Sequence, residues 1–378
     1  MEDTMTSDAD APPYVILAEL LDSDPANPDL LFDTAQAAYA ERNYGAAADL
    51  VARHDRAAGA TPASRHLAGL IAMARGDWSD AAETFAGLIA GGEDAAAIRF
   101  NLGWALAMDG RKAEALAAID DDVALSNGAA AQLYVGLLHE AGAMDEGLAF
   151  ARTALGSFPD HRGLNATVST LAIDAEDLDL ARETARRAGD HPDALVTAAT
   201  LALNADDVTT AARAFEAVLA RDPHHPRARI GRGLVALYGD DPAAAADDLD
   251  AGAERFGTHL GSWIAAGWAH VLAGDMATAK ARFERASAID DSFGETQGSL
   301  AVVSLATGDL DEARRRTEIA LRLDRDSFSA ALASAMLANA AGDAKTAQRI
   351  VALAMRTPVD ASGRTIGQAM ARLSAKRG

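Results

Sequence analysis

The stretch GDWSDAAETF at residues 76–85 recurs as GDMATAKARF at 274–283, GDLDEARRRT at 308–317 and GDAKTAQRIV at 342–351. In each copy a small residue stands five positions after the glycine. Following that residue along the chain gives a ladder of ten positions: Ala47, Ala81, Ala115, Gly147, Ala181, Ala211, Ala245, Ala279, Ala313 and Ala347. Successive members lie 34, 34, 32, 34, 30, 34, 34, 34 and 34 residues apart, which is typical of a repeat protein. The alternative is an ordinary helical bundle, in which ten small residues would have to fall at this regular spacing by chance.

Each repeat has the pattern of two helices joined by a short turn. In residues 262–291, Trp263, Ala266, Gly267 and His270 fall on one face of a first helix. Gly274 suits a left-handed position after that helix, and Asp275 or Thr278 can cap the next one. Ala279, Phe283 and Ala286 then form the inner stripe of the second helix. Prolines after some second helices, as in RDPHHP at 221–226, end them.

Small residues also recur on the predicted first helices, at Gly69, Gly103, Gly233 and Gly267. We expect a larger side chain at these places, or on the ladder, to push the two helices of a repeat apart. The two helices of a repeat would bury one face against each other and another face against the next repeat. A single repeat therefore cannot be stable alone.

These motifs resemble the tetratricopeptide repeat family, which has a 34-residue period with Trp-x2-Leu-Gly on the first helix and Ala-x3-Phe, then Pro, on the second. The matches are Trp263–Gly267 with Ala279–Phe283, Leu102–Gly103 with Ala115, Ala81–Phe85, Ala211–Phe215 with Pro223, and Ala154 with Pro159. The resemblance covers roughly residues 28–360. It implies an all-α, right-handed α-solenoid of about ten helical hairpins.

The flanking segments and the two irregular steps complete the predicted organisation. Residues 1–13 are predicted to be a disordered acidic segment, and residues 14–27 a short helical cap, with Tyr14–Leu21 as its helix. Residues 361–378 are predicted to be a capping helix (Thr365–Lys376) with a basic tail. The short steps before Gly147 and Ala211 imply shortened helices or turns near 120–130 and 186–192. Either the array has a seam near 186–192, or the deletions leave its curvature unchanged.

The composition restricts the classes of partner. The net charge of −22 opposes binding to phosphate backbones, so we expect no nucleic-acid partner. No apolar stretch is long enough to cross a membrane, and Met1–Asp10 has no secretion-signal pattern, so we expect a cytoplasmic protein. Residues 1–33 carry nine acidic and no basic residues, whereas residues 345–378 carry seven basic residues and one acidic residue. This asymmetry indicates either weak head-to-tail self-association or two solvated tails.

Catalytic and metal-binding patterns are missing from the sequence. There is no GxxxxGK[ST], GxGxxG after a strand, GxSxG or HExxH motif, and no cysteine. The adjacent His224 and His225 lie in a predicted turn, and the run Asp120–Asp122 lacks calcium-loop spacing. We therefore expect no enzymatic activity, no cofactor and no metal site.

The resemblance places the functional surface on the concave side, at the second, fifth, ninth and twelfth positions of each first helix. Counted from the ladder, these positions are mostly apolar or aromatic. The predicted partner-binding residues are His66, Leu70, Phe100, Trp104, Gln132, His139, Ile230, Leu234, Ile264 and Trp268. Trp104 and Trp268 can instead serve packing between repeats.

The best-known members of the family hold a carboxylate tail with a Lys–Asn–Asn–Lys–Arg set on three first helices. The matching places here carry residues such as Phe100, Asn101, Gln132 and Thr167, so this clamp is missing. The sequence therefore predicts a protein-interaction scaffold or adaptor that binds an apolar or cationic segment of a partner protein. The alternative is a substrate-presenting or chaperone-like accessory subunit of a modifying enzyme encoded elsewhere.

Overall fold

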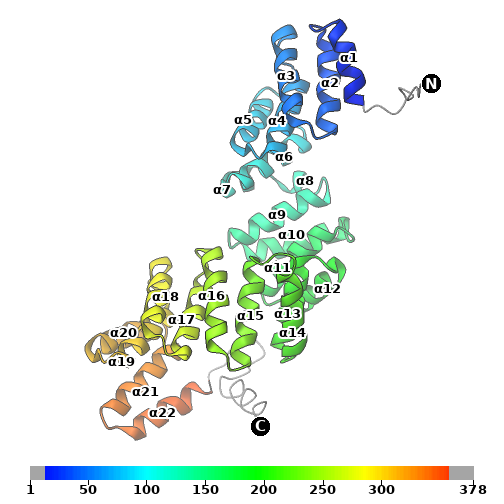
Figure 1. Ribbon diagram of the computed structural model, residues 1–378. Coiled ribbons are helices and arrows are strands. Elements are labelled where there is room, and N and C mark those ends of the chain that lie inside the picture. Colours follow the sequence, from blue (N-terminus) through cyan, green and yellow to red (C-terminus); the bar gives the residue numbers. More distant parts are fainter. Residues whose placement is uncertain (1–12, 357–378) are drawn as a thin grey trace, which may run out of the picture. The chain divides into compact units, whose positions relative to one another are not determined.

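The computed structural model describes residues 13–356, which form 22 α-helices and no β-strand (Figure 1). Two predictions lie outside these residues: the acidic disordered segment, apart from Pro13, and the capping helix with its basic tail at 361–378. The chain divides into two compact units, Met1–Ala175 and Glu176–Gly378. The predicted seam near 186–192 lies within the second unit, and its role as a hinge stays a prediction.

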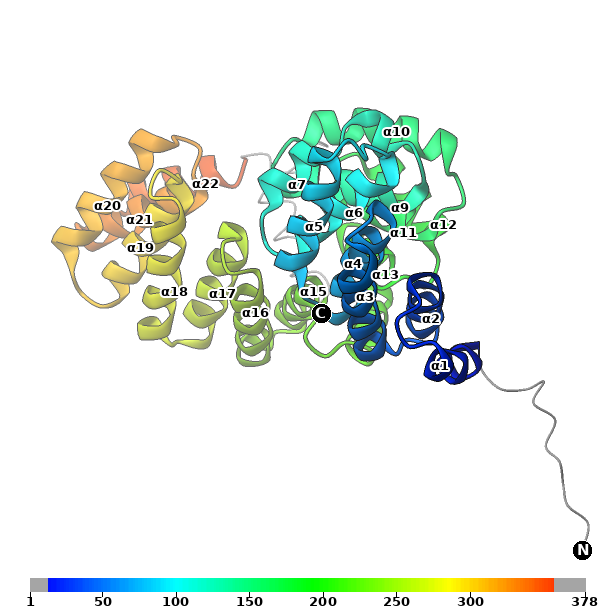
Figure 2. The same cartoon turned by 90° about the horizontal axis from the view of Figure 1, so that it is seen from above.

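The first unit contains α1 to α11, of which α1 covers the predicted helix at Tyr14–Leu21. The helices are α1 (Pro13–Ser23), α2 (Pro28–Ala40), α3 (Tyr44–Ala58), α4 (Pro62–Arg75), α5 (Trp78–Ala90), α6 (Ala96–Met108), α7 (Lys112–Ala118), α8 (Asp121–Ala124), α9 (Gly128–Glu140), α10 (Met144–Ser157) and α11 (Arg162–Asp174). Paired helices such as α2 with α3 and α4 with α5 pack side by side (Figures 1 and 2).

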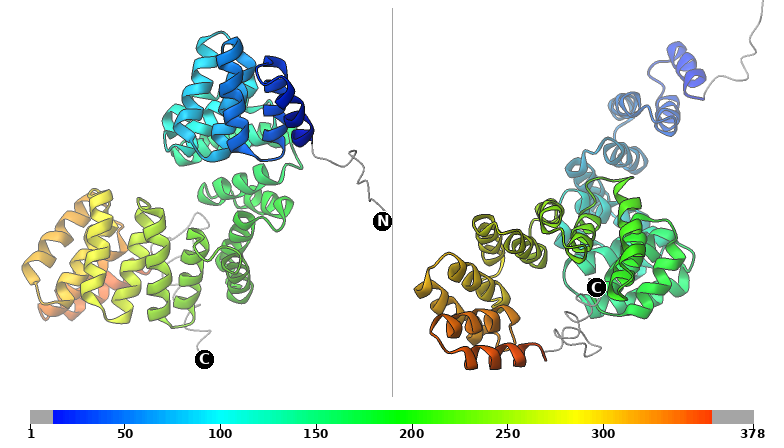
Figure 3. Two further views of the ribbon diagram at one scale, coloured as in Figure 1. Left: turned by 45° about the horizontal axis from the view of Figure 1, so that its top comes forward. Right: turned by 60° about the horizontal axis from the view of Figure 1, so that its bottom comes forward.

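The second unit contains α12 to α22 and repeats the same pairing (Figures 1 and 3). The helices are α12 (Leu178–Ala188), α13 (Pro192–Asn204), α14 (Val208–Leu219), α15 (Pro226–Tyr238), α16 (Pro242–Phe256), α17 (Leu260–Ala273), α18 (Met276–Ile289), α19 (Gly294–Ala306), α20 (Leu310–Leu323), α21 (Phe328–Ala340) and α22 (Ala344–Ala354).

The ladder of small residues marks the second helix of every hairpin, which confirms the helical-hairpin array. Each of the ten ladder residues lies on a different helix: α3, α5, α7, α10, α12, α14, α16, α18, α20 or α22. Eight of its nine alanines are fully buried, and Gly147 is buried too. Ala347 on α22 is half-buried, because no further hairpin among the described residues packs over α22.

The small residues of the first helices allow the close approach that the sequence predicted. A Cβ at Gly69 would lie 2.7 Å from Cζ of Phe85, and one at Gly233 would lie 2.7 Å from Cγ of Leu249. Phe85 and Leu249 are fully buried on the second helix of the same hairpin. A larger residue at either position would therefore have to displace a core side chain.

The turn inside each hairpin holds one residue in the left-handed backbone region. In the 262–291 repeat this residue is Gly274, with φ of 83°, and the Asp275 carboxylate then accepts the Thr278 backbone N–H at 3.0 Å. Glycine occupies the turn in six hairpins, but the other four have non-glycine residues with φ between 59° and 64°. These residues are Arg42, Glu176, Asp206 and Asp240.

The two irregular ladder steps correspond to shortened second helices. In the third hairpin the second helix is broken into α7 with 7 residues and α8 with 4 residues, and the Asp120 carboxylate caps α8. Between Ala181 and Ala211, α12 has 11 residues and ends at Ala188, four residues before Pro192 begins α13. The deletions thus shorten helix and turn while the ladder alanines stay buried.

Candidate functional site

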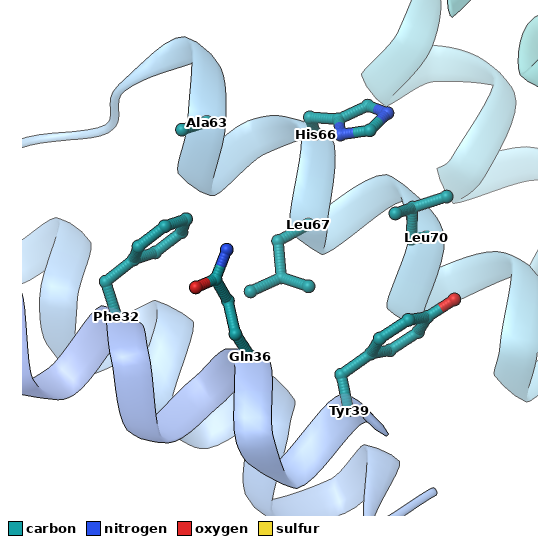
Figure 4. Close-up of a pocket in the computed structure, with 7 residues that line it drawn as sticks. All are labelled: Phe32, Gln36, Tyr39, Ala63, His66, Leu67 and Leu70. Atoms are coloured by element: carbon teal, nitrogen blue, oxygen red, sulfur yellow. The ribbon is translucent and has the colours of Figure 1, made fainter. Parts of the chain in front are cut away.

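A pocket of about 310 Å³ lies between α2 and α4, the first helices of the first two hairpins. Figure 4 shows Phe32 and Gln36 of α2 and Leu67 of α4 pointing toward one another across it. Its lining contains aromatic and aliphatic side chains and no charged Lys, Arg, Asp or Glu. The lining residues are Phe32, Gln36, Tyr39, Ala63, His66, Leu67 and Leu70. Two of the predicted site residues, His66 and Leu70, are thus brought together in one cavity.

Three polar groups project from this apolar lining. The Gln36 amide points between Phe32 and Leu67, and the Tyr39 hydroxyl and His66 imidazole lie toward the end marked by Leu70 (Figure 4). None of the three side chains makes a hydrogen bond to another residue within 13–356, although the His66 ring packs 5.9 Å from that of Phe85. The pocket therefore combines an apolar contact surface with free hydrogen-bond donors and acceptors.

Capping interactions fix where the two pocket helices begin. The Asn27 side chain accepts the Leu30 backbone N–H at 3.2 Å, and Pro28 occupies the first turn of α2. At α4, Thr61 and Ser64 form a reciprocal capping box, with Pro62 as the first helical residue. These caps set the register in which side chains of the two helices face each other.

Sequence reasoning did not name five of the seven lining residues: Phe32, Gln36, Tyr39, Ala63 and Leu67. The repeat period is the signal that identifies three of them, because Phe32, Gln36 and Tyr39 stand 34 residues before His66, Leu70 and Met73. Extending the groove positions back by one repeat would have found three of the five. Ala63 occupies the second position of its own repeat, and Leu67 belongs to the buried core beneath the pocket.

The predicted aromatic pair in the third hairpin lies on α6. The rings of Phe100 and Trp104 are 5.9 Å apart in an edge-to-face arrangement, and both side chains are half-buried. This contact is within one helix, so it leaves the choice between partner contact and packing open for Trp104.

Gln132 and His139 on α9 both contact the next first helix, α11. The Gln132 amide packs against the backbone at Gly163, and His139 Nε2 lies 2.9 Å from Asp174 Oδ2. These polar groups join neighbouring hairpins within the first unit.

The remaining predicted site residues, in the second unit, pack against neighbouring helices. Ile230 on α15 lies over Gly252 of α16, and Leu234 joins the apolar clusters on either side of it. Ile264 packs beside Trp268 on the cluster of Phe283, Leu300 and Val303. All four side chains are half-buried.

Charged groups that the sequence did not single out form ion-pair clusters in the second unit. Asp248, buried on α16, accepts hydrogen bonds from Arg229 and Arg232, with Arg229 Nη1 at 2.7 Å. Burial opposes ionisation, but the two guanidinium groups prevail and lower the pKa of Asp248. A similar balance of burial against Arg282 and His270 lowers the pKa of Asp250.

The histidine and aspartate clusters considered in the sequence have structural roles. His225 caps the start of α15, where its Nδ1 accepts the Ala228 backbone N–H at 3.3 Å and its Nε2 lies 3.2 Å from Asp193. His224 is exposed in the turn, and Asp120 caps α8. Across residues 13–356, no group of three or more His, Asp or Glu side chains is arranged to hold a metal ion.

Comparisons with known proteins agree with this architecture. Residues 66–129 and 196–259 match a family model described as tetratricopeptide repeat. None of the curated proteins matches the chain.

Among solved structures, the chain is similar to the crystal structure of the APC/C hetero-tetramer Cut9-Hcn1, with 15% identity over 96% of this chain and 86% of that chain, and a TM-score of 0.52. It is also similar to a crystal structure of MamA (18% identity, 40% of this chain, 89% of that chain, TM-score 0.35). A MamA from Desulfovibrio magneticus RS-1 gives 20% identity over 44% of this chain and 96% of that chain, with a TM-score of 0.37.

The chain is therefore an all-helical solenoid protein built from tandem hairpins. The two matched regions resemble the tetratricopeptide repeat, as the sequence motifs do, and each contains most of two successive hairpins: α4 to α8 in residues 66–129 and α13 to α16 in residues 196–259.

None of the helices found between residues 13 and 356 is long and apolar enough to cross a bilayer.

Proposed function

We propose that this protein is an interaction scaffold that binds a segment of a partner polypeptide in the pocket between α2 and α4. The observation that carries the proposal is the combination of apolar walls with the Gln36, Tyr39 and His66 side chains, which have no hydrogen-bond partner within the described chain. A pocket of this kind binds one apolar side chain and orients it by a few polar contacts.

The partner segment would place an apolar side chain against Phe32, Leu67 and Leu70. Burying such a side chain stabilises a complex by roughly 1.5–3 kcal/mol. The Gln36 amide offers both a donor and an acceptor, so it suits the backbone N–H and C=O of a bound peptide. His66 and Tyr39 would add contacts at the other end of the pocket.

Charge favours an apolar or cationic segment over an anionic one. The pocket lining has no lysine or arginine, and the net charge of the chain is −22. The places that correspond to the carboxylate clamp carry Phe100, Asn101, Gln132 and Thr167. A peptide carboxylate would therefore find no basic side chain in the pocket lining or at those four places.

Selection of peptides from a phage-displayed library on the full chain tests the proposal. The test variant is Gln36→Arg, because Gln36 is exposed and a long cationic side chain there fills the pocket. The matched control is Thr209→Arg, which adds the same charge at an exposed position of α14. We expect the selected peptides to bind the Gln36→Arg variant at least tenfold more weakly and the control as tightly as the unmodified chain. Equal binding to both variants would show that the pocket is not the binding site.

A further inference from the structure

We propose that the exposed strip of α1 binds the basic strip of α22 in a second copy of this chain. This interaction surface is distinct from the pocket between α2 and α4 and does not depend on it. The case begins with the side chains that each of the two helices leaves uncovered.

Helix α1 presents large apolar side chains to solvent. Val15, Ile16 and Leu20 are 41%, 43% and 54% exposed, whereas Leu21 on the opposite side is buried against the α2–α4 core. Val15 lies one helical turn before Glu19, and Ile16 one turn before Leu20, so these four side chains form one continuous strip. Adjacent exposed apolar side chains of this kind mark an interaction surface more often than isolated ones do.

The strip of α1 is also negatively charged. Glu19 lies within it, Asp22 follows one turn later, and α1 contains no basic residue. The twelve residues before α1 add four acidic residues and no basic residue. Neither Glu19 nor Asp22 has an ion-pair partner among residues 13–356. A complementary surface must therefore be apolar and positively charged, which excludes a second α1 strip because like charges would face each other.

Helix α22 has the complementary character. Lys345, Arg349 and Leu353 are exposed and follow one another at spacings of four residues along one side of the helix, and the exposed Arg356 lies in the turn three residues after Leu353. Leu353 is 70% exposed, more than any other large apolar side chain among the described residues. The helix contains no acidic residue, and none of the three basic side chains has an ion-pair partner in the described chain.

The opposite charges of the two strips set the geometry of the assembly. A contact between α1 of one copy and α22 of another is heterologous and uses one strip of each copy, so the bound pair still carries one unused α1 strip and one unused α22 strip. Association then continues by addition of further copies. Because the charges are exposed, salt should weaken it: the screening length falls from about 10 Å at 0.1 M to about 3 Å at 1 M ionic strength.

Light scattering on the full chain across concentration and salt series tests the proposal. We expect the weight-average mass to rise with protein concentration and to fall as sodium chloride is added. Glu19→Lys combined with Asp22→Lys, or Lys345→Glu combined with Arg349→Glu, should each raise the dissociation constant about tenfold or more. The matched single reversals Glu83→Lys and Arg186→Glu, at exposed positions of α5 and α12, should leave it unchanged.

Mixing the two double variants gives the sharpest result. Each variant alone has strips of like charge, but a mixture again contains opposite strips, so we expect the mixture to assemble. Leu20→Ser tests the apolar part separately, with circular dichroism to verify that each variant folds. A monomer at every concentration and salt level overturns the proposal, as does assembly that the charge reversals do not change. Gln36→Arg should not alter self-association, so this proposal and the pocket proposal can fail separately.

Discussion

The ring of Phe85 on α5 occupies the space in which residue 69 on α4 would carry a Cβ, at 2.7 Å from Cζ and 2.9 Å from Cε1. Phe85 is fully buried and cannot move aside without displacing its neighbours. We expect Gly69→Ala to destabilise the protein, because overpacking costs about 1–3 kcal/mol and exceeds the gain of about 1 kcal/mol in helix propensity. Thermal unfolding measures the difference.

Gly87 is the matched control for this substitution. It lies inside α5, is exposed, and has nothing within 4 Å of the place where a Cβ would be. Gly87→Ala should therefore raise stability by up to about 1 kcal/mol. Stabilisation by both substitutions would mean that Phe85 relaxes at little cost.

Arg42 holds the left-handed turn between α2 and α3, with φ of 61°, at the place where six other hairpins have glycine. A side chain in this region costs about 1–2 kcal/mol, and part of that is offset by the greater freedom of glycine in the unfolded chain. We expect Arg42→Gly to raise the free energy of unfolding by about 0.5–1 kcal/mol. Arg56→Gly, near the end of α3 at an exposed helical site, should lower it, and denaturant titrations of both variants check the pair.

The Glu295 carboxylate on α19 joins two hairpins by accepting the backbone N–H groups of Phe328 at 2.5 Å and Ser329 at 3.1 Å, at the start of α21. Glu295→Ala would leave those donors without this acceptor and should cost about 1–2 kcal/mol. Faster hydrogen exchange at the Phe328 and Ser329 amides would locate the effect. Glu318→Ala, on the exposed side of α20, serves as the control, and equal losses from both variants would contradict the capping role.

The hydrogen bonds from Arg315 and Arg316 lower the pKa of Glu312 on α20 from 4.5 to about 2. A carboxyl group whose pKa is lower in the folded state contributes stability above the unfolded value and loses it as the pH falls through the folded value. We expect the difference in melting temperature between the unmodified chain and the Glu312→Gln variant to have its largest value near pH 6. It should shrink between about pH 5 and pH 2. A difference that does not change over this range would contradict the shift.

The hairpin architecture could be predicted because its signals are local and repeated. The positions of Ala279, Phe283 and Ala286 follow from helical periodicity, and all three are fully buried in the structure. Gly274 and Asp275 occupy the predicted turn and cap. The four non-glycine turns, such as Arg42, could not be recognised by residue type, although each stands five residues before a ladder position.

The candidate pocket was only partly predictable. His66 and Leu70 were named from the repeat positions, and Phe32, Gln36 and Tyr39 share those positions one repeat earlier. Repeat position alone does not separate a pocket from packing. Ile264 and Trp268 occupy the same positions as lining residues, yet they pack on an apolar cluster.

The helical hairpins, their number and the small residues that let the paired helices approach all follow from the amino-acid sequence. These features depend on periodicity and on contacts within one repeat, which recur along the chain. The pocket between α2 and α4 and the exposed apolar side chains of α1 and α22 became apparent only from the packing of the helices. Those outcomes depend on which side chains of neighbouring hairpins fill the space between helices. The identity of residues at one repeat position cannot specify this, because the side chains on the other side of such a space lie in a neighbouring repeat.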